Sequence, residues 1–266
     1  MNKIRICIAG ATGWIGKELV HAVVNSEDLD LVGAVARRNS GKDLGELLDL
    51  KNLSLIISGT VEEAMRTKTD VLIDYTSPNV VKSNVLTAID MGVHTVIGTS
   101  GLTDDDYAEI DRSARKAGVG VFAAGNFAIS AALMLHFATI AAKFMPGWEL
   151  IDYASSSKID SPSGTAYEIA NRLSEIGKPE TVIPDSKING PRESRGFNAN
   201  GMHIHSVRLP GYVIGADVIF GGKDERLTLK FEAGTLPDSY IEGTLLAARK
   251  VKDMRGLTRG LDKLIL

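Results

Sequence analysis

Residues 4–16 read Ile4-Arg5-Ile6-Cys7-Ile8-Ala9-Gly10-Ala11-Thr12-Gly13-Trp14-Ile15-Gly16. The first six residues are mostly apolar, which is typical of a buried strand, and residues 19–24 repeat apolar side chains with helical spacing. The glycines therefore lie between a strand and a helix, where they let a pyrophosphate approach the backbone at the helix start. A tight turn without a ligand is the alternative. We predict a dinucleotide-binding loop made of Gly10, Ala11, Thr12, Gly13, Trp14, Ile15 and Gly16.

The first half of the sequence continues as alternating strand and helix patterns. Apolar runs at 70–75, 95–97 and 119–122 are separated by helical patterns at 81–89 and 104–117. This alternation favours a doubly wound parallel sheet, whose ligand lies outside the carboxyl ends of the strands. Small or polar residues follow each run, as close packing against a cofactor requires. We therefore expect further cofactor contacts from Thr76, Gly98, Thr99, Ser100, Ala124, Asn126 and Phe127.

The second strand pattern, residues 30–35, is followed by Ala36-Arg37-Arg38-Asn39-Ser40. In a dinucleotide fold, an acidic residue at the end of this strand binds the ribose hydroxyls and repels a 2′-phosphate. Here that place holds Ala36, and the next two residues carry guanidinium groups that suit a phosphate monoester. We predict that Arg37 and Arg38 select NADPH, with NADH as the less favoured cofactor. Two solvated surface arginines are the alternative.

The pattern changes after residue 127. An irregular polar stretch, residues 178–200, resembles a flexible surface loop, and the strands after it are joined by short turns. The strand patterns cover residues 148–153, 202–209, 212–220 and 226–233, and the helix patterns cover residues 133–144, 167–177 and 239–251. We predict an α/β chain with an N-terminal Rossmann doubly wound parallel sheet and a C-terminal α+β domain with a mixed or antiparallel sheet.

A second candidate site lies in the second half, where Lys158 precedes Ser163-Gly164-Thr165 and a helical pattern. The hydroxyls and free backbone N–H groups of this triplet stand at a helix start, which favours an anion such as a carboxylate. The ammonium group of Lys158 is close enough in sequence to reach the same anion. We predict an anionic small-molecule substrate here. A Ser/Thr-rich loop with an ordinary N-cap is the alternative.

Composition limits the class of protein. The 266 residues carry a formal charge of −3, which gives no basic field for nucleic acid or a membrane surface. A single cysteine, Cys7, excludes an internal disulfide framework, and no apolar run is long enough to cross a membrane, so we expect a cytoplasmic protein. The histidines show no metal-ligand grouping. His203 and His205 share one face of a strand and either approach a substrate or form structural hydrogen bonds.

With these motifs placed, the chain resembles along nearly its whole length the 4-hydroxy-tetrahydrodipicolinate reductase (dihydrodipicolinate reductase) family of diaminopimelate and lysine biosynthesis. The resemblance lies in residues 10–16, 74–78, 98–103, 126–127, 158–166 and 203–208. It implies hydride transfer from a nicotinamide to a cyclic dicarboxylate. It also implies that Gly164 and Thr165 bind a substrate carboxylate and that Lys158 is the catalytic lysine.

The resemblance also predicts the division of the chain. Residues 1–127, completed by 238–266, are expected to form the NADPH-binding Rossmann domain. Residues 128–237 are expected to carry the substrate and the oligomer contacts, and the implied assembly is a homotetramer. The substrate is expected to lie between the two domains.

One segment departs from the family pattern. The family is rich in histidine just before its lysine, whereas this chain has Tyr153-Ala154-Ser155-Ser156-Ser157. Ala154 stands where the family's proposed proton donor would be, and Ser155 stands where a substrate-binding histidine would be, so Ser155 is kept as a substrate-binding candidate. A missing general acid typically costs on the order of 10²–10⁴ in rate.

Three explanations of this departure remain open. Lys158, Tyr153 or a bound water supplies the proton. Alternatively, the pocket is rebuilt for another imine or carbonyl substrate. The third explanation is a non-catalytic NADPH-binding regulator.

Overall fold

The computed structural model describes residues 3–181, 183–212, 214–234 and 236–265. It divides the chain into two compact units. The first comprises the residues up to Phe127 together with Pro237–Leu264, and the second comprises Ala128–Leu236. Each unit has its own sheet, so the predicted fold class is confirmed.

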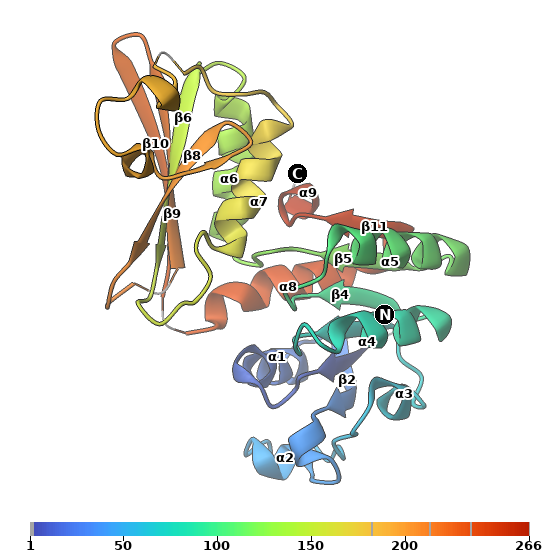
Figure 1. Ribbon diagram of the computed structural model, residues 1–266. Helices are drawn as coiled ribbons and strands as arrows, with labels where there is room; N and C mark the ends of the chain where they lie inside the picture. The colour runs from blue at the N-terminus through green and yellow to red at the C-terminus, as the bar shows by residue number, and fades with distance from the viewer. Residues whose placement is uncertain (1–2, 182, 213, 235, 266) are drawn as a thin grey trace. The chain divides into compact units, whose positions relative to one another are not determined.

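The first unit contains a six-stranded sheet in the order β11-β5-β4-β3-β1-β2, in which every neighbouring pair is parallel. Its strands are β1 (Ile4–Ala9), β2 (Leu29–Val35), β3 (Val71–Asp74), β4 (His94–Ile97), β5 (Gly120–Ala123) and β11 (Gly256–Arg259). The five strands of the first half follow the predicted patterns. The sixth, β11, was not predicted, and it pairs with β5 from far along the chain (Figure 1).

Helices cover this sheet and are amphipathic because their apolar residues recur on one side. They are α1 (Trp14–Val24), α2 (Leu44–Leu47), α3 (Val61–Ala64), α4 (Val81–Asp90), α5 (Asp104–Ala117), α8 (Asp238–Lys250) and α9 (Asp262–Ile265), with the 3₁₀ turns η1 (Arg37–Asn39) and η4 (Val251–Asp253). Helix α8 packs against α1, and Thr244 on α8 shares a 2.8 Å hydrogen bond with the Tyr75 hydroxyl. The segment after residue 236 thus completes the first unit.

The core of the first unit consists of the β-branched and apolar residues of its central strands. Ile6, Ile8, Leu72 and Ile73 are fully buried, as strands covered on both faces require. Cys7 lies among them, and burial raises the pKa of its thiol to about 12. A buried thiol with so high a pKa is unreactive at neutral pH.

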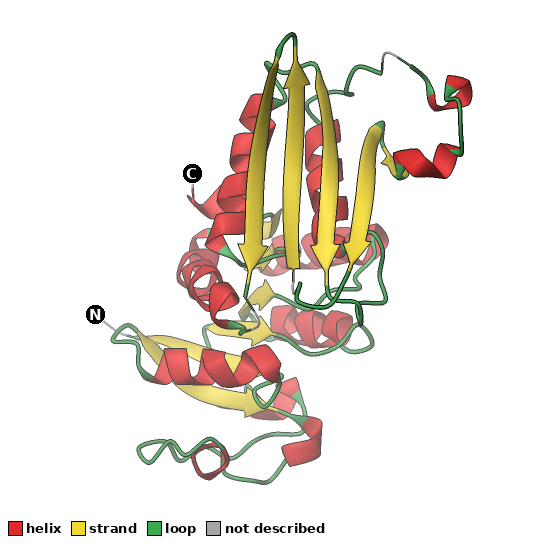
Figure 2. Cartoon of the chain, turned by 90° about the vertical axis from the view of Figure 1, so that its left-hand side faces the viewer, coloured by secondary structure: helices red, strands yellow, loops and turns green. Residues whose placement is uncertain are grey.

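The second unit contains a five-stranded mixed sheet in the order β10-β9-β6-β8-β7. Strands β6 and β8 are parallel, and the other neighbours are antiparallel. Helices α6 and α7 lie together on one face of the sheet (Figures 1 and 2). The elements are α6 (Ile129–Ala141), β6 (Gly147–Ala154), α7 (Gly164–Ser174), η2 (Asp185–Lys187), η3 (Arg192–Arg195), β7 (Phe197–Ala199), β8 (Met202–Arg208), β9 (Ile214–Gly222) and β10 (Glu225–Ala233).

The prediction of a wholly irregular stretch at 178–200 was wrong at its end, because Phe197–Ala199 pairs with β8. Asn200 and Gly201 both have positive φ, 55° and 98°, and such a pair closes a tight hairpin. Of the predicted strand 212–220, residue 213 lies outside the described residues.

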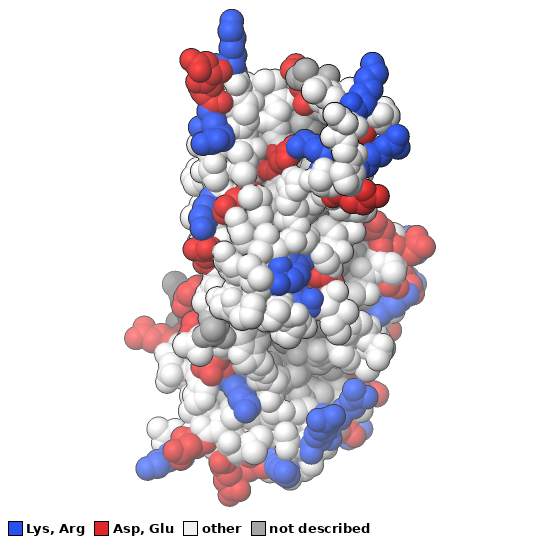
Figure 3. Space-filling model, turned by 60° about the vertical axis from the view of Figure 1, so that its left-hand side comes forward, with Lys and Arg blue, Asp and Glu red and all other residues white. Residues whose placement is uncertain are grey.

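Two further properties of the described residues are the length of their apolar helices and the distribution of surface charge. Among the helices of the described residues, none is long and apolar enough to cross a membrane. Figure 3 shows acidic and basic side chains interspersed over the face in view, without a broad area of one charge.

Candidate active site

The glycine-rich loop is built as a backbone cradle. Gly10 has a φ of +86°, and a Cβ there would lie 2.1 Å from the Tyr75 carbonyl oxygen. A Cβ on Gly16 would lie 2.0 Å from the Gly10 carbonyl oxygen. A side chain at either position would collide with backbone, so the tight turn requires glycine. Gly13 is the N-cap of α1 and supplies no capping side chain, which leaves the first N–H groups of the helix for a ligand.

A pocket of about 950 Å³ opens beside this loop in the first unit. Its volume and its backbone cradle fit a dinucleotide. Six of the predicted cofactor residues line the pocket: Gly10, Thr12, Gly13, Arg37, Arg38 and Thr76. The wall also contains residues that were not predicted, among them Asn39, Thr60, Ser77 and Asn84.

The other predicted cofactor residues do not line this pocket. Gly98 is required for packing, because a Cβ there would lie 2.1 Å from the Tyr75 ring. Phe127 is a core residue that packs against Phe122 and Tyr75. Trp14 is 55% exposed, and its ring meets Tyr240 edge-on at 6.1 Å. Cofactor contacts remain predictions for Ala11, Trp14, Ile15, Gly16, Gly98, Thr99, Ser100, Ala124, Asn126 and Phe127.

Arg37 and Arg38 form the start of η1, one residue after the end of β2, and both are exposed. In the part of the chain that the structure describes, neither guanidinium takes part in an ion pair. Asn39 donates a hydrogen bond of 3.2 Å to the Thr12 hydroxyl, and Lys42 donates one of 3.3 Å to Asn39. The Asn39 bond fastens η1 to the glycine-rich loop, and both arginines line the pocket.

A buried carboxylate that sequence analysis missed organises the ends of β3 and β4. Asp74 is fully buried, and it accepts hydrogen bonds from the hydroxyls of Thr76 and Thr99, each at 2.7 Å, and from the Asn84 amide at 2.8 Å. Asp74 therefore joins two of the predicted cofactor residues. The sequence held one signal of this role, which was an acidic residue inside an otherwise apolar strand. A carboxylate buried in this way needs several hydrogen-bond donors around it.

In the second unit, the predicted substrate triplet begins helix α7. Ser163 is the N-cap, and its hydroxyl accepts a hydrogen bond of 3.2 Å from the Ala166 backbone. The Ser163 N–H and hydroxyl donate to the two oxygens of Asp152 at 2.8 and 2.6 Å. Asp152 is 1% exposed, so strand β6 fixes the start of α7 through a buried carboxylate. Gly164 is exposed and Thr165 is buried at this helix start.

Arg208 on β8 neutralises Asp152. Its Nη2 lies 2.8 Å from the Asp152 carboxylate and donates a 2.9 Å hydrogen bond to the Asp160 carbonyl oxygen. The arginine therefore ties the loop between β6 and α7 to the sheet. Sequence analysis assigned no role to Asp152 or Arg208, although a charged residue within an alternating strand pattern was the available signal.

The loop itself carries Lys158. Its Nζ lies 2.8 Å from the Asp160 carboxylate, and its backbone N–H donates to the Ser155 carbonyl at 3.0 Å, which closes a turn. Ser155 and Ser157 share a hydrogen bond of 3.0 Å between their hydroxyls. Lys158 and Ser155 thus lie on one short loop that leads to the anchored start of α7.

Tyr153 lies on the other face of the sheet from this site. Side chains alternate along β6, so Tyr153 points away from the face that holds Asp152 and the fully buried Ala154. The Tyr153 hydroxyl donates a 3.2 Å hydrogen bond to Asp217, and burial and that carboxylate raise its pKa. Among the three proton sources considered from sequence, Tyr153 is therefore not placed to act beside Ser163.

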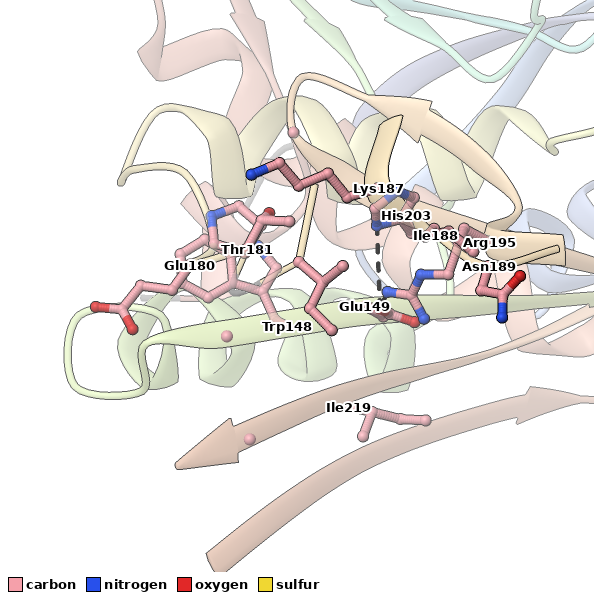
Figure 4. A pocket seen from close by; sticks show the side chains of 15 residues that line it. Trp148, Glu149, Glu180, Thr181, Lys187, Ile188, Asn189, Arg195, His203 and Ile219 are labelled. Carbon is pink, nitrogen blue, oxygen red and sulfur yellow. Dashed lines mark hydrogen bonds and ion pairs between the residues drawn. The ribbon is translucent and has the colours of Figure 1, made fainter. Parts of the chain in front are cut away.

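A second pocket, of about 720 Å³, lies between the sheet of the second unit and the segments 179–181 and 183–195 (Figure 4). Glu149 at its wall accepts a 2.8 Å hydrogen bond from His205 and pairs with Arg195. The other histidine, His203, lies 3.0 Å from Asp185. His203 thus fastens η2 to the sheet through Asp185, whereas η3 is fastened by the ion pair of Arg195 with Glu149, and His205 joins β8 to β6 through the same Glu149. Within the described ranges, no group of three or more His, Cys, Asp or Glu could hold a metal ion.

A doubly wound parallel sheet with a glycine-rich loop between its first strand and its first helix is the architecture of Rossmann-type dinucleotide-binding domains. Family comparison agrees: "Dihydrodipicolinate reductase, N-terminus" matches residues 4–127, and "Dihydrodipicolinate reductase, C-terminus" matches residues 130–265. The chain belongs to the dihydrodipicolinate reductase family, which consists of NAD(P)H-dependent oxidoreductases.

Individual relatives match over the full length. The 4-hydroxy-tetrahydrodipicolinate reductase of Desulfitobacterium hafniense is 40% identical, with 100% of each chain covered. That of Moorella thermoacetica is 36% identical, with 98% of each chain covered. Among solved structures, the dipicolinate-bound dihydrodipicolinate reductase of Paenisporosarcina sp. TG-14 is 32% identical, with a TM-score of 0.82 and coverage of 98% of this chain and 99% of that chain.

Proposed function

We propose that the protein is a 4-hydroxy-tetrahydrodipicolinate reductase that uses NADPH to reduce a cyclic dicarboxylate in the diaminopimelate and lysine pathway. The observation that carries the proposal is the start of α7, which the buried Asp152 fixes in place and which Lys158 precedes on the same loop. When bound, the nicotinamide supplies a hydride to an electron-poor carbon of the substrate. The residues of this chain bind and orient the substrate and provide a proton.

Each group of the site has a distinct part in this proposal. The backbone N–H groups of Gly164 and Thr165 bind a substrate carboxylate at the positive end of the helix. Ser163 caps the helix, and Ser155 offers a further hydroxyl to the substrate. Lys158 pairs with the substrate's negative charge, and it or a bound water delivers the proton.

The cofactor preference can be tested at η1. Replacing Arg37 and Arg38 together with alanine should weaken NADPH binding roughly 10- to 100-fold and NADH binding by less than about twofold, because only NADPH loses charge-assisted hydrogen bonds. Fluorescence titration with each dinucleotide measures both constants. The matched control is Arg66→Ala/Arg112→Ala, which removes two exposed arginines of the same unit. Equal losses for both cofactors would refute the assignment.

Turnover with the family substrate tests the reaction itself. The substrate is generated in place by a dihydrodipicolinate synthase from pyruvate and aspartate semialdehyde, and NADPH oxidation is followed by absorbance. We expect turnover by the unmodified protein, and we expect Ala154→His to raise it by up to about 10²-fold, within the range that a general acid contributes. Tight NADPH binding without turnover would contradict the proposed substrate.

One observation favours a second candidate function. Ala154 is fully buried at the end of β6, on the same face as Asp152, and it cannot transfer a proton. A substrate site that lacks the family's proposed proton donor would reduce a different cyclic imine or carbonyl compound, with the same hydride chemistry. A screen of such compounds, run on protein that binds NADPH but not the family substrate, separates this function from a non-catalytic NADPH-binding regulator.

The assembly and the location of the protein are also part of the proposal. The family resemblance supports a homotetramer, with residues 128–237 supplying substrate and oligomer contacts and residues 1–127 with 238–266 binding the cofactor. Light scattering on the purified chain tests the assembly. A cytoplasmic protein that binds neither nucleic acid nor membrane fits the mixed surface charge.

A further inference from the structure

The ion pair between Lys158 and Asp160 lies at the predicted substrate site. The Lys158 Nζ lies 2.8 Å from Asp160 Oδ1, and the two side chains are 33% and 52% exposed. Both residues belong to the loop that leads into α7. The cation expected to meet a substrate carboxylate therefore already meets a carboxylate of the protein.

Asp160 precedes Gly164, the first residue of α7, by four residues. Burial raises the pKa of Asp160, but hydrogen bonding and charge attraction to Lys158 outweigh it and leave the pKa below its usual value. The N–H of Gly164 is one of the donors assigned to the substrate. In sequence, Asp160 thus lies between the lysine and the helix start of the proposed carboxylate site.

The position of Asp160 is fixed by the sheet. Its carbonyl oxygen accepts a 2.9 Å hydrogen bond from Arg208, and Arg208 is itself paired with the buried Asp152. The backbone of this residue is therefore held, while its carboxylate remains half exposed. An exposed ion pair of this kind is weak, and an incoming anion can replace it.

We propose that the Asp160 carboxylate pairs with Lys158 in place of the substrate carboxylate in the ligand-free protein, and that a small cyclic carboxylic acid must displace it from Lys158 in order to bind. The inference rests on the proposed function of Lys158. Asp160 then sets the affinity for the substrate class, because every bound carboxylate competes with an internal one. It also holds the ammonium of Lys158 within the loop before α7 until the substrate arrives.

The test is the affinity of Asp160→Asn for dipicolinate, measured by isothermal titration calorimetry with NADPH present. Asparagine keeps the shape of the side chain and removes the competing charge. We expect dipicolinate to bind roughly two- to fivefold more tightly, the range that an exposed ion pair spans, and we expect the gain to shrink at high salt. Asp160→Glu retains the charge and should not show the gain.

The matched control is Asp224→Asn, which removes one exposed negative charge from the turn between β9 and β10. Asp224 has a φ of +63°, which asparagine also tolerates. A gain for Asp160→Asn alone supports a local effect, and an equal gain for both variants overturns the inference. If the asparagine disturbs the loop, as circular dichroism would reveal, Asp160→Ser provides the same comparison.

The remaining outcomes separate the two proposals. Dipicolinate binding by the unmodified protein with unchanged or weaker binding by Asp160→Asn overturns the inference and leaves the proposed function standing. It would mean that Asp160 instead holds Lys158 in a productive position. Binding by neither protein, with NADPH still bound, overturns the proposed substrate class and the inference with it. Binding by the variant alone supports the inference.

Discussion

Replacing Lys158 with alanine is expected to lower kcat by roughly 10²–10⁴, the range that a positioned proton donor contributes, and to raise KM. The physical reason is that Lys158 is proposed to supply the positive charge beside the substrate carboxylate and is one of the two proposed sources of the proton. NADPH affinity should be nearly unchanged, because the dinucleotide pocket lies in the first unit. Steady-state kinetics and NADPH titration measure these quantities. Lys143→Ala, an exposed lysine of the second unit, is the matched control.

Lys158→Arg separates the two roles of the lysine. Arginine retains the positive charge but does not release a proton at working pH. If Lys158 is the proton donor, this variant recovers much of KM but little of kcat. If a bound water is the donor, it recovers both. Activity retained by Lys158→Ala would remove the lysine from the mechanism.

Replacing Asp152 with alanine is expected to have the largest effect on stability. Removing one partner of a buried ion pair typically costs about 3–5 kcal/mol, because the other charge is left without compensation. Here Arg208 would lose its partner, and the N–H and hydroxyl of Ser163 would lose their acceptors. Urea unfolding followed by circular dichroism measures the loss, with signals from both units analysed separately because the chain need not unfold in two states.

Two variants sharpen this test. Asp217→Ala removes a carboxylate from the opposite face of the same sheet, where it accepts a hydrogen bond from the Tyr153 hydroxyl, and it should cost far less. Asp152→Ala/Arg208→Met removes both charges and should recover part of the stability, since the buried cation is gone. Wild-type stability for Asp152→Ala alone would show that this pair does not hold the start of α7.

Most of the first unit could be predicted because its strands are local apolar runs. The run Ile4–Ala9 and the glycines after it give strand, turn and helix without reference to the rest of the chain. β11 could not be predicted, since Gly256–Arg259 is short and has only one apolar side chain, Leu257. It is a strand because β5 offers it a free edge, and that is a tertiary effect.

The candidate site was predictable only in part, for a similar reason. Ser163 follows a local capping rule, and sequence analysis identified the start of α7 from it. Its supports, Asp152 and Arg208, are brought together by the pairing of β6 with β8, and the register of that pairing depends on residues more than fifty positions apart. The Asp74 cluster likewise joins residues from strand β3, the loop after β4 and helix α4.

The late position of β11 has a consequence for synthesis of the protein. The whole second unit, Ala128–Leu236, lies in the sequence between β5 and the elements that complete the first unit. A growing chain therefore displays β5 as an unpaired sheet edge while the second unit is being made, and such edges are prone to pair with other chains. The interval in which this edge is open is set by the time that the ribosome needs to translate the second unit.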